Sequence, residues 1–182
     1  MVLGDGVAGV THEQRVAVTV IRSSVSRCEP STQQGCAVHV GTSSIAAYDV
    51  VAGCAGVAVS TWMPSIEALS VFARAASGAI ATQALINPLL GIDGLELLRT
   101  HSADETLRRL LASDPGSDSR QVAIVDKYGR SAAHTGPETH PWSGRRAAPG
   151  YAVAGNMLVD MRTVDAASAR CPRWPATASC RR

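Results

Sequence analysis

Gly41 and Thr42, at the head of the run TSSIAAYD, form a pair at which catalytic chemistry could begin. A threonine hydroxyl is a weak nucleophile that needs a nearby base, and the α-amine of the same residue can fill that role when the threonine is N-terminal. Such an amine titrates near ~8, close to working pH. It exists only once the peptide bond before Thr42 is broken. Spacing alone favours the simpler alternative, a Gly-Thr pair that opens a β-strand.

Other motifs offer less. Residues 4–9, GDGVAG, match GxGxxG, but no strand precedes them and no helix clearly follows, so dinucleotide binding is a remote alternative. The five cysteines are irregularly spaced without a CxxC pair, and the histidines are scattered, so no zinc site is predicted. We predict neither a metal nor a cofactor. Cys54 is predicted to be a small buried residue, with the other cysteines in poorly structured ends.

Composition indicates one globular domain. Of the 182 residues, 46% are hydrophobic and 18% charged, which is typical of a chain with a real core. The formal net charge is +2 and Lys127 is the single lysine, so a nucleic-acid partner is not expected. No apolar run approaches the ~20 residues that span a bilayer, so no membrane association is expected. A cytoplasmic location is the default prediction.

The chain divides into three regions. Residues 1–41 form an N-terminal extension with one strand candidate, RVAVTVI, and residues 161–182 form a tail without a clear period, predicted to be disordered. Between them, residues 42–160 carry regular signals. SSIAAYD and GCAGVAVST predict a hairpin, and further strands are predicted in GAIATQAL, RQVAIVD, SAAHTG and GYAVAGNML. GLELLRT predicts a short helix, and Ser102 with Glu105 predicts a capping box for a second. This order favours an α+β layered fold.

Residues 42–160 resemble the family called domain of unknown function 1028, of the N-terminal-nucleophile (Ntn) hydrolase superfamily. The resemblance is carried, in order, by TSSIAAYD, GVAVST, GAIATQALINPLLG, GLELL, LLASDPGSDSRQVAIVD, AAHTG and GYAVAGNML. It implies a four-layer αββα sandwich of two stacked antiparallel sheets. It also implies amide hydrolysis through an acyl-enzyme, with Thr42 as nucleophile after loss of residues 1–41, which would be a propeptide or lie before a misplaced start. A small-molecule amide or short peptide is the implied substrate, and the resemblance allows a homo-oligomer.

The resemblance also suggests which residues surround the nucleophile. Ser44 shares a strand face with Thr42 and could hold the amine or a water, while Gly155 and Asn156 could supply oxyanion donors. Each has a structural alternative of about equal weight. The suggested substrate-binding residues are Gln83, Asn87, Arg120 and His134. A turn role for Asn87, an exposed strand-edge role for Arg120 and a structural role for His134 are the competing interpretations.

Two departures from the family pattern favour a second hypothesis. Trp62 stands where many relatives are expected to have a basic residue, so a group that could tune the amine is missing. After GNML, the family is expected to continue with a long helix and further structure, whereas this chain ends in a Cys/Pro/Arg-rich stretch. The alternative is therefore a catalytically inactive, truncated homologue, either a binding module or a degenerate protein, with a sandwich incomplete at its C-terminus.

Overall fold

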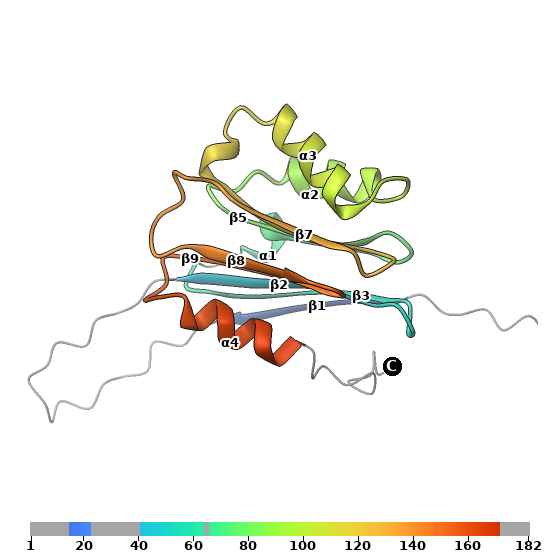
Figure 1. The fold of residues 1–182 in the computed structure, drawn as a ribbon, viewed down its shortest axis with the longest axis horizontal. Helices are drawn as coiled ribbons and strands as arrows, with labels where there is room; N and C mark the ends of the chain where they lie inside the picture. The colour runs from blue at the N-terminus through green and yellow to red at the C-terminus, as the bar shows by residue number, and fades with distance from the viewer. Residues whose placement is uncertain (1–14, 23–40, 64–65, 172–182) are drawn as a thin grey trace, which may run out of the picture.

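Two β-sheets stacked face to face make up the centre of the molecule (Figure 1). The computed structural model describes residues 15–22, 41–63 and 66–171. The first sheet has the strand order β1-β3-β2-β9-β8 and the second β4-β5-β6-β7. The strands of the first sheet are β1 (Arg15–Arg22), β2 (Thr42–Asp49), β3 (Cys54–Thr61), β8 (Gly144–Ala148) and β9 (Tyr151–Asn156). Those of the second are β4 (Val71–Arg74), β5 (Gly78–Ala84), β6 (Arg120–Asp126) and β7 (Ser131–Thr135).

Neighbouring strands run antiparallel, with the exception of β1, which is parallel to β3. The predicted hairpin of β2 and β3 is confirmed. Its turn is held by the Asp49 carboxylate, whose Oδ1 accepts the N–H groups of Val51 and Ala52 at 2.9 and 3.0 Å. Gly53 follows with a φ of 64°, a backbone conformation that glycine adopts without strain. The strand predicted in RVAVTVI is confirmed as β1.

Small side chains fill the layer between the sheets. In β2 and β3, buried and half-buried residues alternate, because successive side chains point to opposite faces of the sheet. Together with the buried residues of β9 in the same sheet, this set meets the inner faces of β5 and β6. Its alanines are Ala46, Ala55, Ala79, Ala81, Ala123, Ala152 and Ala154. A layer made largely of alanine and valine lets the two sheets pack close together.

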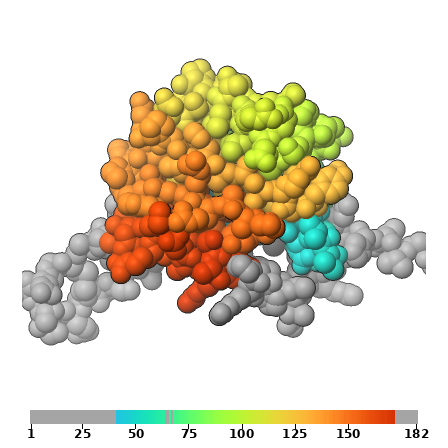
Figure 2. All heavy atoms as spheres, in the orientation of Figure 1, coloured from blue at the N-terminus to red at the C-terminus, as the bar shows by residue number. Residues whose placement is uncertain are grey.

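Helices cover both outer faces (Figures 1 and 2). The helices α2 (Leu89–Leu97) and α3 (Ala103–Ser113) lie on the second sheet, where their leucines pack against Ile80, Val122 and Ile124. The helix α4 (Arg162–Arg170) lies on the first sheet, where Val164 packs against Tyr151 and Val153. A single turn, α1 (Glu67–Ser70), precedes β4, and a 3₁₀ turn, η1 (Ser117–Ser119), precedes β6. Among the described helices, none has the length and apolar character needed to cross a membrane.

Several elements differ from the sequence predictions, although the α+β class is confirmed. The prediction of an irregular tail from residue 161 is wrong for α4, whose sequence RTVDAASAR buries little more than Val164 and so lacks a visible apolar stripe. The strands β4 and β8 were not predicted. The first is four residues long, and the second, GRRAA, is an edge strand without buried positions. The helix α2 begins five residues before the predicted GLELLRT.

The cysteine prediction is also corrected. Cys54 is half-buried and disulfide-bonded rather than a plain buried residue. Cys171, placed in the tail by the sequence, is a half-buried free thiol at the end of α4, and burial raises its pKa. The GxGxxG match at residues 4–9 and the stretch 172–182 lie outside the described residues.

The start of α3 tests the predicted capping box of Ser102 and Glu105. The Ser102 Oγ accepts the N–H of Glu105 at 3.2 Å, as the capping box predicts, but the Glu105 carboxylate bonds Arg109 and Arg108 instead of completing the box. Ser102→Ala should therefore lower the free energy of unfolding by about 1 kcal/mol, the usual value for a lost N-cap. Ser102→Asp should preserve it. Urea denaturation checks both, and equal loss in the two variants would contradict a capping role.

Candidate active site

Thr42 is the first residue of β2 and lies at the end of the first sheet. It pairs with Thr61 of β3 on one side and with Asn156 of β9 on the other. Its exposed fraction is 8%, and it lies on the face of β2 that also carries Ser44 and Ala46. Because Ala46 belongs to the layer between the sheets, Thr42 faces the second sheet. The predicted nucleophile therefore stands where the inner layer ends.

The Thr42 hydroxyl has one defined partner among the described side chains. Its Oγ1 lies 2.9 Å from the Oγ1 of Thr61. Thr61 Oγ1 in turn accepts the N–H of Met63 at 3.2 Å. With one lone pair so occupied, the Thr61 hydroxyl keeps its hydrogen and a second lone pair, so either threonine can be the donor in the pair. When Thr61 donates, this contact orients the Thr42 oxygen and leaves the Thr42 proton available to a base.

Ser44 lies two residues further along the same face and is 1% exposed. Within the described part of the chain its Oγ has no hydrogen-bond partner. Its neighbours in the ladders are Val59 and Ala154, which offer no polar side chain. A buried hydroxyl without a partner loses the free energy of a hydrogen bond. The Ser44 hydroxyl is therefore able to bind a water molecule or a polar group of a ligand.

Asn156 is joined to the second sheet by an amide network centred on Gln121. The Gln121 side chain is fully buried, and its Oε1 accepts from Asn156 Nδ2 at 3.1 Å and from Gln83 Nε2 at 2.6 Å. The two hydrogens of its Nε2 are shared among three acceptors, the carbonyl oxygens of Gly155 and Gly144 at 2.9 and 3.1 Å and Thr135 Oγ1 at 2.9 Å. The two backbone carbonyls can only accept, so they fix which end of the Gln121 amide faces them. Gln83 Oε1, at the far end, has no partner among the described residues.

The glycines of the site are explained by close packing. A Cβ on Gly155 would meet Leu158 Cδ1 at 2.6 Å, because this residue faces α4 rather than the second sheet. A Cβ on Gly41 would lie 3.0 Å from the Met157 carbonyl oxygen and 3.2 Å from Leu158 Cδ2. The bond between Gly41 and Thr42 therefore runs against the end of β9, where a larger residue would force a shift.

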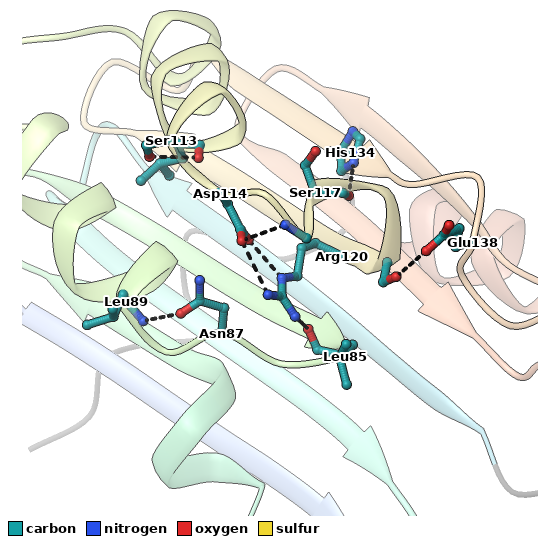
Figure 3. A network of polar contacts seen from close by, with 12 residues as sticks. Leu85, Asn87, Leu89, Ser113, Asp114, Ser117, Arg120, His134 and Glu138 are labelled. Atoms are coloured by element: carbon teal, nitrogen blue, oxygen red, sulfur yellow. Dashed lines mark hydrogen bonds and ion pairs between the residues drawn. The ribbon is translucent and has the colours of Figure 1, made fainter.

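Arg120 belongs to a second polar cluster on the helix side of the second sheet (Figure 3). Its Nε and Nη2 bond both oxygens of Asp114 at 2.7 and 3.3 Å, and its Nη1 bonds the Leu85 carbonyl at 2.6 Å. The side chains of Arg120 and Asp114 are 14% and 6% exposed. The hydrogen bond from Arg120 holds the pKa of the Asp114 carboxyl below its usual value, and the Gly116 N–H and the Asn87 side chain add to this effect. Arg120 is thus engaged within the protein.

Asn87 and His134 belong to the same cluster (Figure 3). The Asn87 Oδ1 accepts the N–H of Leu89 at 3.1 Å, at the start of α2. His134 pairs with Val122, a residue of the helix-side core, and its Nε2 lies 2.9 Å from the Ser117 carbonyl. A carbonyl requires a donor, so this nitrogen carries the proton. Of the four residues suggested for substrate binding, Gln83 faces the inner layer with Thr42, while Asn87, Arg120 and His134 lie on the other face of the sheet.

Comparison with known proteins places the chain in a family. Residues 42–173 match the family described as "Family of unknown function (DUF1028)". The chain belongs to the DUF1028 family. No curated protein matches it. Among solved structures, it is similar to the DUF1028 protein SPO2555 from Silicibacter pomeroyi, with 27% identity and a TM-score of 0.68. The similarity covers 71% of this chain and 60% of the other, so this chain spans little more than half of that protein's length.

Gln121 and Thr61 are the site residues that the sequence did not single out. Gln121 is the second residue of the segment RQVAIVD, where a glutamine between an arginine and a valine looks like an exposed strand start. Gln83 and Gln121 occupy paired positions on neighbouring strands, a signal visible once the register is known.

Trp62 is 54% exposed just beyond β3. Within the described ranges no three His, Cys, Asp or Glu residues gather in a group that could hold a metal ion.

The amide network makes a prediction about stability. Gln121→Leu leaves the side-chain amides of Gln83 and Asn156 without this partner and removes the donor to the carbonyl oxygens of Gly155 and Gly144, and each buried unsatisfied group costs about 1–3 kcal/mol. We expect a loss of at least about 3 kcal/mol in the free energy of unfolding, measured by urea denaturation. The matched control is Gln83→Leu. It removes one hydrogen bond and an oxygen that already lacks a partner, so it should cost clearly less; equal losses would contradict the central role of Gln121.

The buried ion pair makes a prediction about pH. The pKa of Asp114 is lower in the folded chain than in the unfolded one, so its contribution is complete above the unfolded pKa of about 3.9 and is lost as the pH falls through the folded value. Asp114→Asn should destabilise by about 3 kcal/mol at pH 7, since it leaves Arg120 buried without its counter-ion. The difference from wild type should shrink below about pH 4. Glu96→Gln, at an exposed ion pair with Arg74 and Arg99, is the control and should change stability little. A constant difference for Asp114→Asn down to low pH would contradict the assignment.

Proposed function

We propose that this protein is an amide-bond hydrolase of the Ntn superfamily, in which Thr42 becomes the N-terminal nucleophile when residues 1–41 are removed. The observation that carries the proposal is the position of Thr42, first residue of a central strand, buried at the end of the inter-sheet layer and bonded to Thr61. The layering of helices on the outer faces of two stacked sheets fits the sandwich of that superfamily.

The proposed reaction has two steps. The neutral α-amine of Thr42 takes the hydroxyl proton while Oγ1 attacks the carbonyl carbon of the substrate amide. The α-amine then passes this proton to the substrate nitrogen, which leaves as an amine when the C–N bond breaks. Water then hydrolyses the ester on Oγ1 and releases the acid. Thr61, bonded to the same oxygen, orients it for attack. No metal or cofactor is needed for these steps.

Neighbouring groups support particular roles. Asn156 pairs directly with Thr42, and with one hydrogen of Nδ2 held by Gln121, its second hydrogen is available to a developing oxyanion. Ser44 has an unengaged hydroxyl on the same face and could bind the attacking water or the amine. Gly155 is assigned a packing role, because its Cα faces Leu158 and its carbonyl is used by Gln121. A small-molecule amide or short peptide remains the proposed substrate.

An inactive binding module is the second candidate, and one observation favours it. The segment that must be cut from Thr42 includes β1, which is paired along its whole length with β3. An extension built into the sheet suits a protein that keeps its N-terminal region. In that case the Thr42 nitrogen stays in a peptide bond and cannot act as a base.

Processing and pH dependence test the enzyme hypothesis. Intact mass of the expressed protein should show a chain that begins at Thr42. The wild-type chain should release amine from small amide substrates, with kcat/KM rising with pH up to about 8 as the α-amine loses its proton. Thr42→Ala should reduce this rate by about 10³-fold or more.

Ser43→Ala is the matched control. Ser43 adjoins Thr42 but is on the alternate, half-buried face of β2, so it should leave processing and rate unchanged. A wild-type chain that keeps residues 1–41 quantitatively would contradict the enzyme hypothesis and favour the binding module.

A further inference from the structure

The strand β1 lies outside the residues that match the family, yet it completes the first sheet. The family match begins at residue 42, whereas β1 spans Arg15–Arg22. It pairs with β3 over eight consecutive residues, from Arg15 opposite Cys54 to Arg22 opposite Thr61. On its other side β3 pairs with β2 over the same eight residues. Without β1, therefore, β3 would become an edge strand with a full row of unpaired backbone groups.

The position of β1 also matters for the second sheet. Register places Val16, Val18 and Val20 opposite Ala55, Val57 and Val59, the β3 residues that face the inner layer. The strand also lies against β4, the edge strand of the second sheet. The backbone of β1 thus lies beside both the hydrogen-bonding edge of β3 and the edge strand of the second sheet.

The bond whose cleavage activates Thr42 is not part of this pairing. Arg22 lies opposite Thr61, and Thr61 lies opposite Thr42, so the end of β1 is two strand spacings, about 10 Å, from the residue that would be freed. Residues 23–41 connect the two points. Breaking the chain before Thr42 therefore removes a covalent connection but none of the backbone hydrogen bonds between β1 and β3.

We propose that residues 15–22 remain bound as a strand of the first sheet after the chain is cut, so that the processed protein consists of two segments. The inference rests on the proposed function for the cut at Gly41-Thr42, but the binding itself does not. The edge of β3 recognises the segment by strand addition, in which main-chain hydrogen bonds give the affinity. Its occupant is the chain's own N-terminal segment.

The test cuts the connector deliberately. A recognition sequence for a site-specific protease is inserted after Pro30, the purified full chain is cleaved, and the products are separated by size exclusion in reducing buffer, so that no disulfide holds them. Intact mass of the fractions identifies the pieces. We expect the N-terminal piece to elute with the remainder of the chain. Elution of this piece as a free peptide, apart from a folded remainder, would overturn the inference.

A diproline variant, Val18→Pro with Thr19→Pro, tests whether strand pairing is the cause. N–H groups alternate between the two edges of a strand, so one of two adjacent prolines removes a bond to β3 and interrupts the strand. This variant should release the piece, while Ser23→Pro with Ser24→Pro, just after the strand, should retain it. Retention in the first variant would contradict strand pairing.

Hydrogen exchange on the cleaved wild-type chain gives a second measurement that does not require a variant to fold. Amides of residues 15–22 that bond β3 should stay protected after cleavage, and exchange as fast as in a free peptide would overturn the inference. Failure of the proposed function is seen separately. An untreated chain that keeps the Gly41-Thr42 bond contradicts the hydrolase, whereas release of the piece after protease treatment contradicts the retained strand.

Discussion

One buried amide, that of Gln121, determines how the two sheets meet at the candidate site. It bonds Gln83 within its own sheet and Asn156, Gly155 and Gly144 in the other. The Gln121 side chain has no access to water in this layer, so each of its polar atoms needs a partner within the protein. Both its oxygen and its nitrogen have such partners, and the buried network is therefore stable. Asn156 is thereby held opposite Thr42 from the far sheet. The position of the proposed oxyanion donor depends on a residue that never touches the nucleophile.

The rest of the inter-sheet layer makes this contact possible. Away from the site the two inner faces consist largely of alanine and valine, so the sheets approach closely enough for a single glutamine to bridge them. Where the alanines end, polar side chains begin: Thr42 and Thr61 on one sheet, Gln83 and Gln121 on the other. Tight packing and the polar end of the layer are thus one feature. Larger core residues would separate the sheets and leave the amides without their partners.

Sequence reasoning recovered the elements with strong local signals and missed those defined by their surroundings. The hairpin of β2 and β3 has a turn, β-branched residues and a glycine at positive φ, and the start of α3 has its cap, so both were predicted. The edge strand β8 and the helix α4 have few buried residues, and their structure comes from packing on β9, which no local pattern records. In the same way, the chemistry of a threonine nucleophile points to Thr42 in the sequence, whereas nothing local points to Gln121, because its contacts depend on pairings between strands distant in sequence. Arg120, Asn87 and His134 were grouped with Thr42 because they are polar residues in the recognised segments; strand alternation places Arg120 and His134 on the opposite face.

The N-terminal extension brings the two candidate functions into conflict at one strand. An Ntn-type mechanism needs a free amine on Thr42, whereas the integrity of the first sheet favours keeping β1 against β3. These demands are compatible only if the covalent bond and the strand pairing are independent. The register makes them so, because the bond before Thr42 and the ladder of β1 share no residue. A broken chain can then keep its edge covered while it exposes the amine, and an unbroken chain can hold the same fold without catalysis. The state of that bond, rather than any difference in the sheets, separates the enzyme from the binding module.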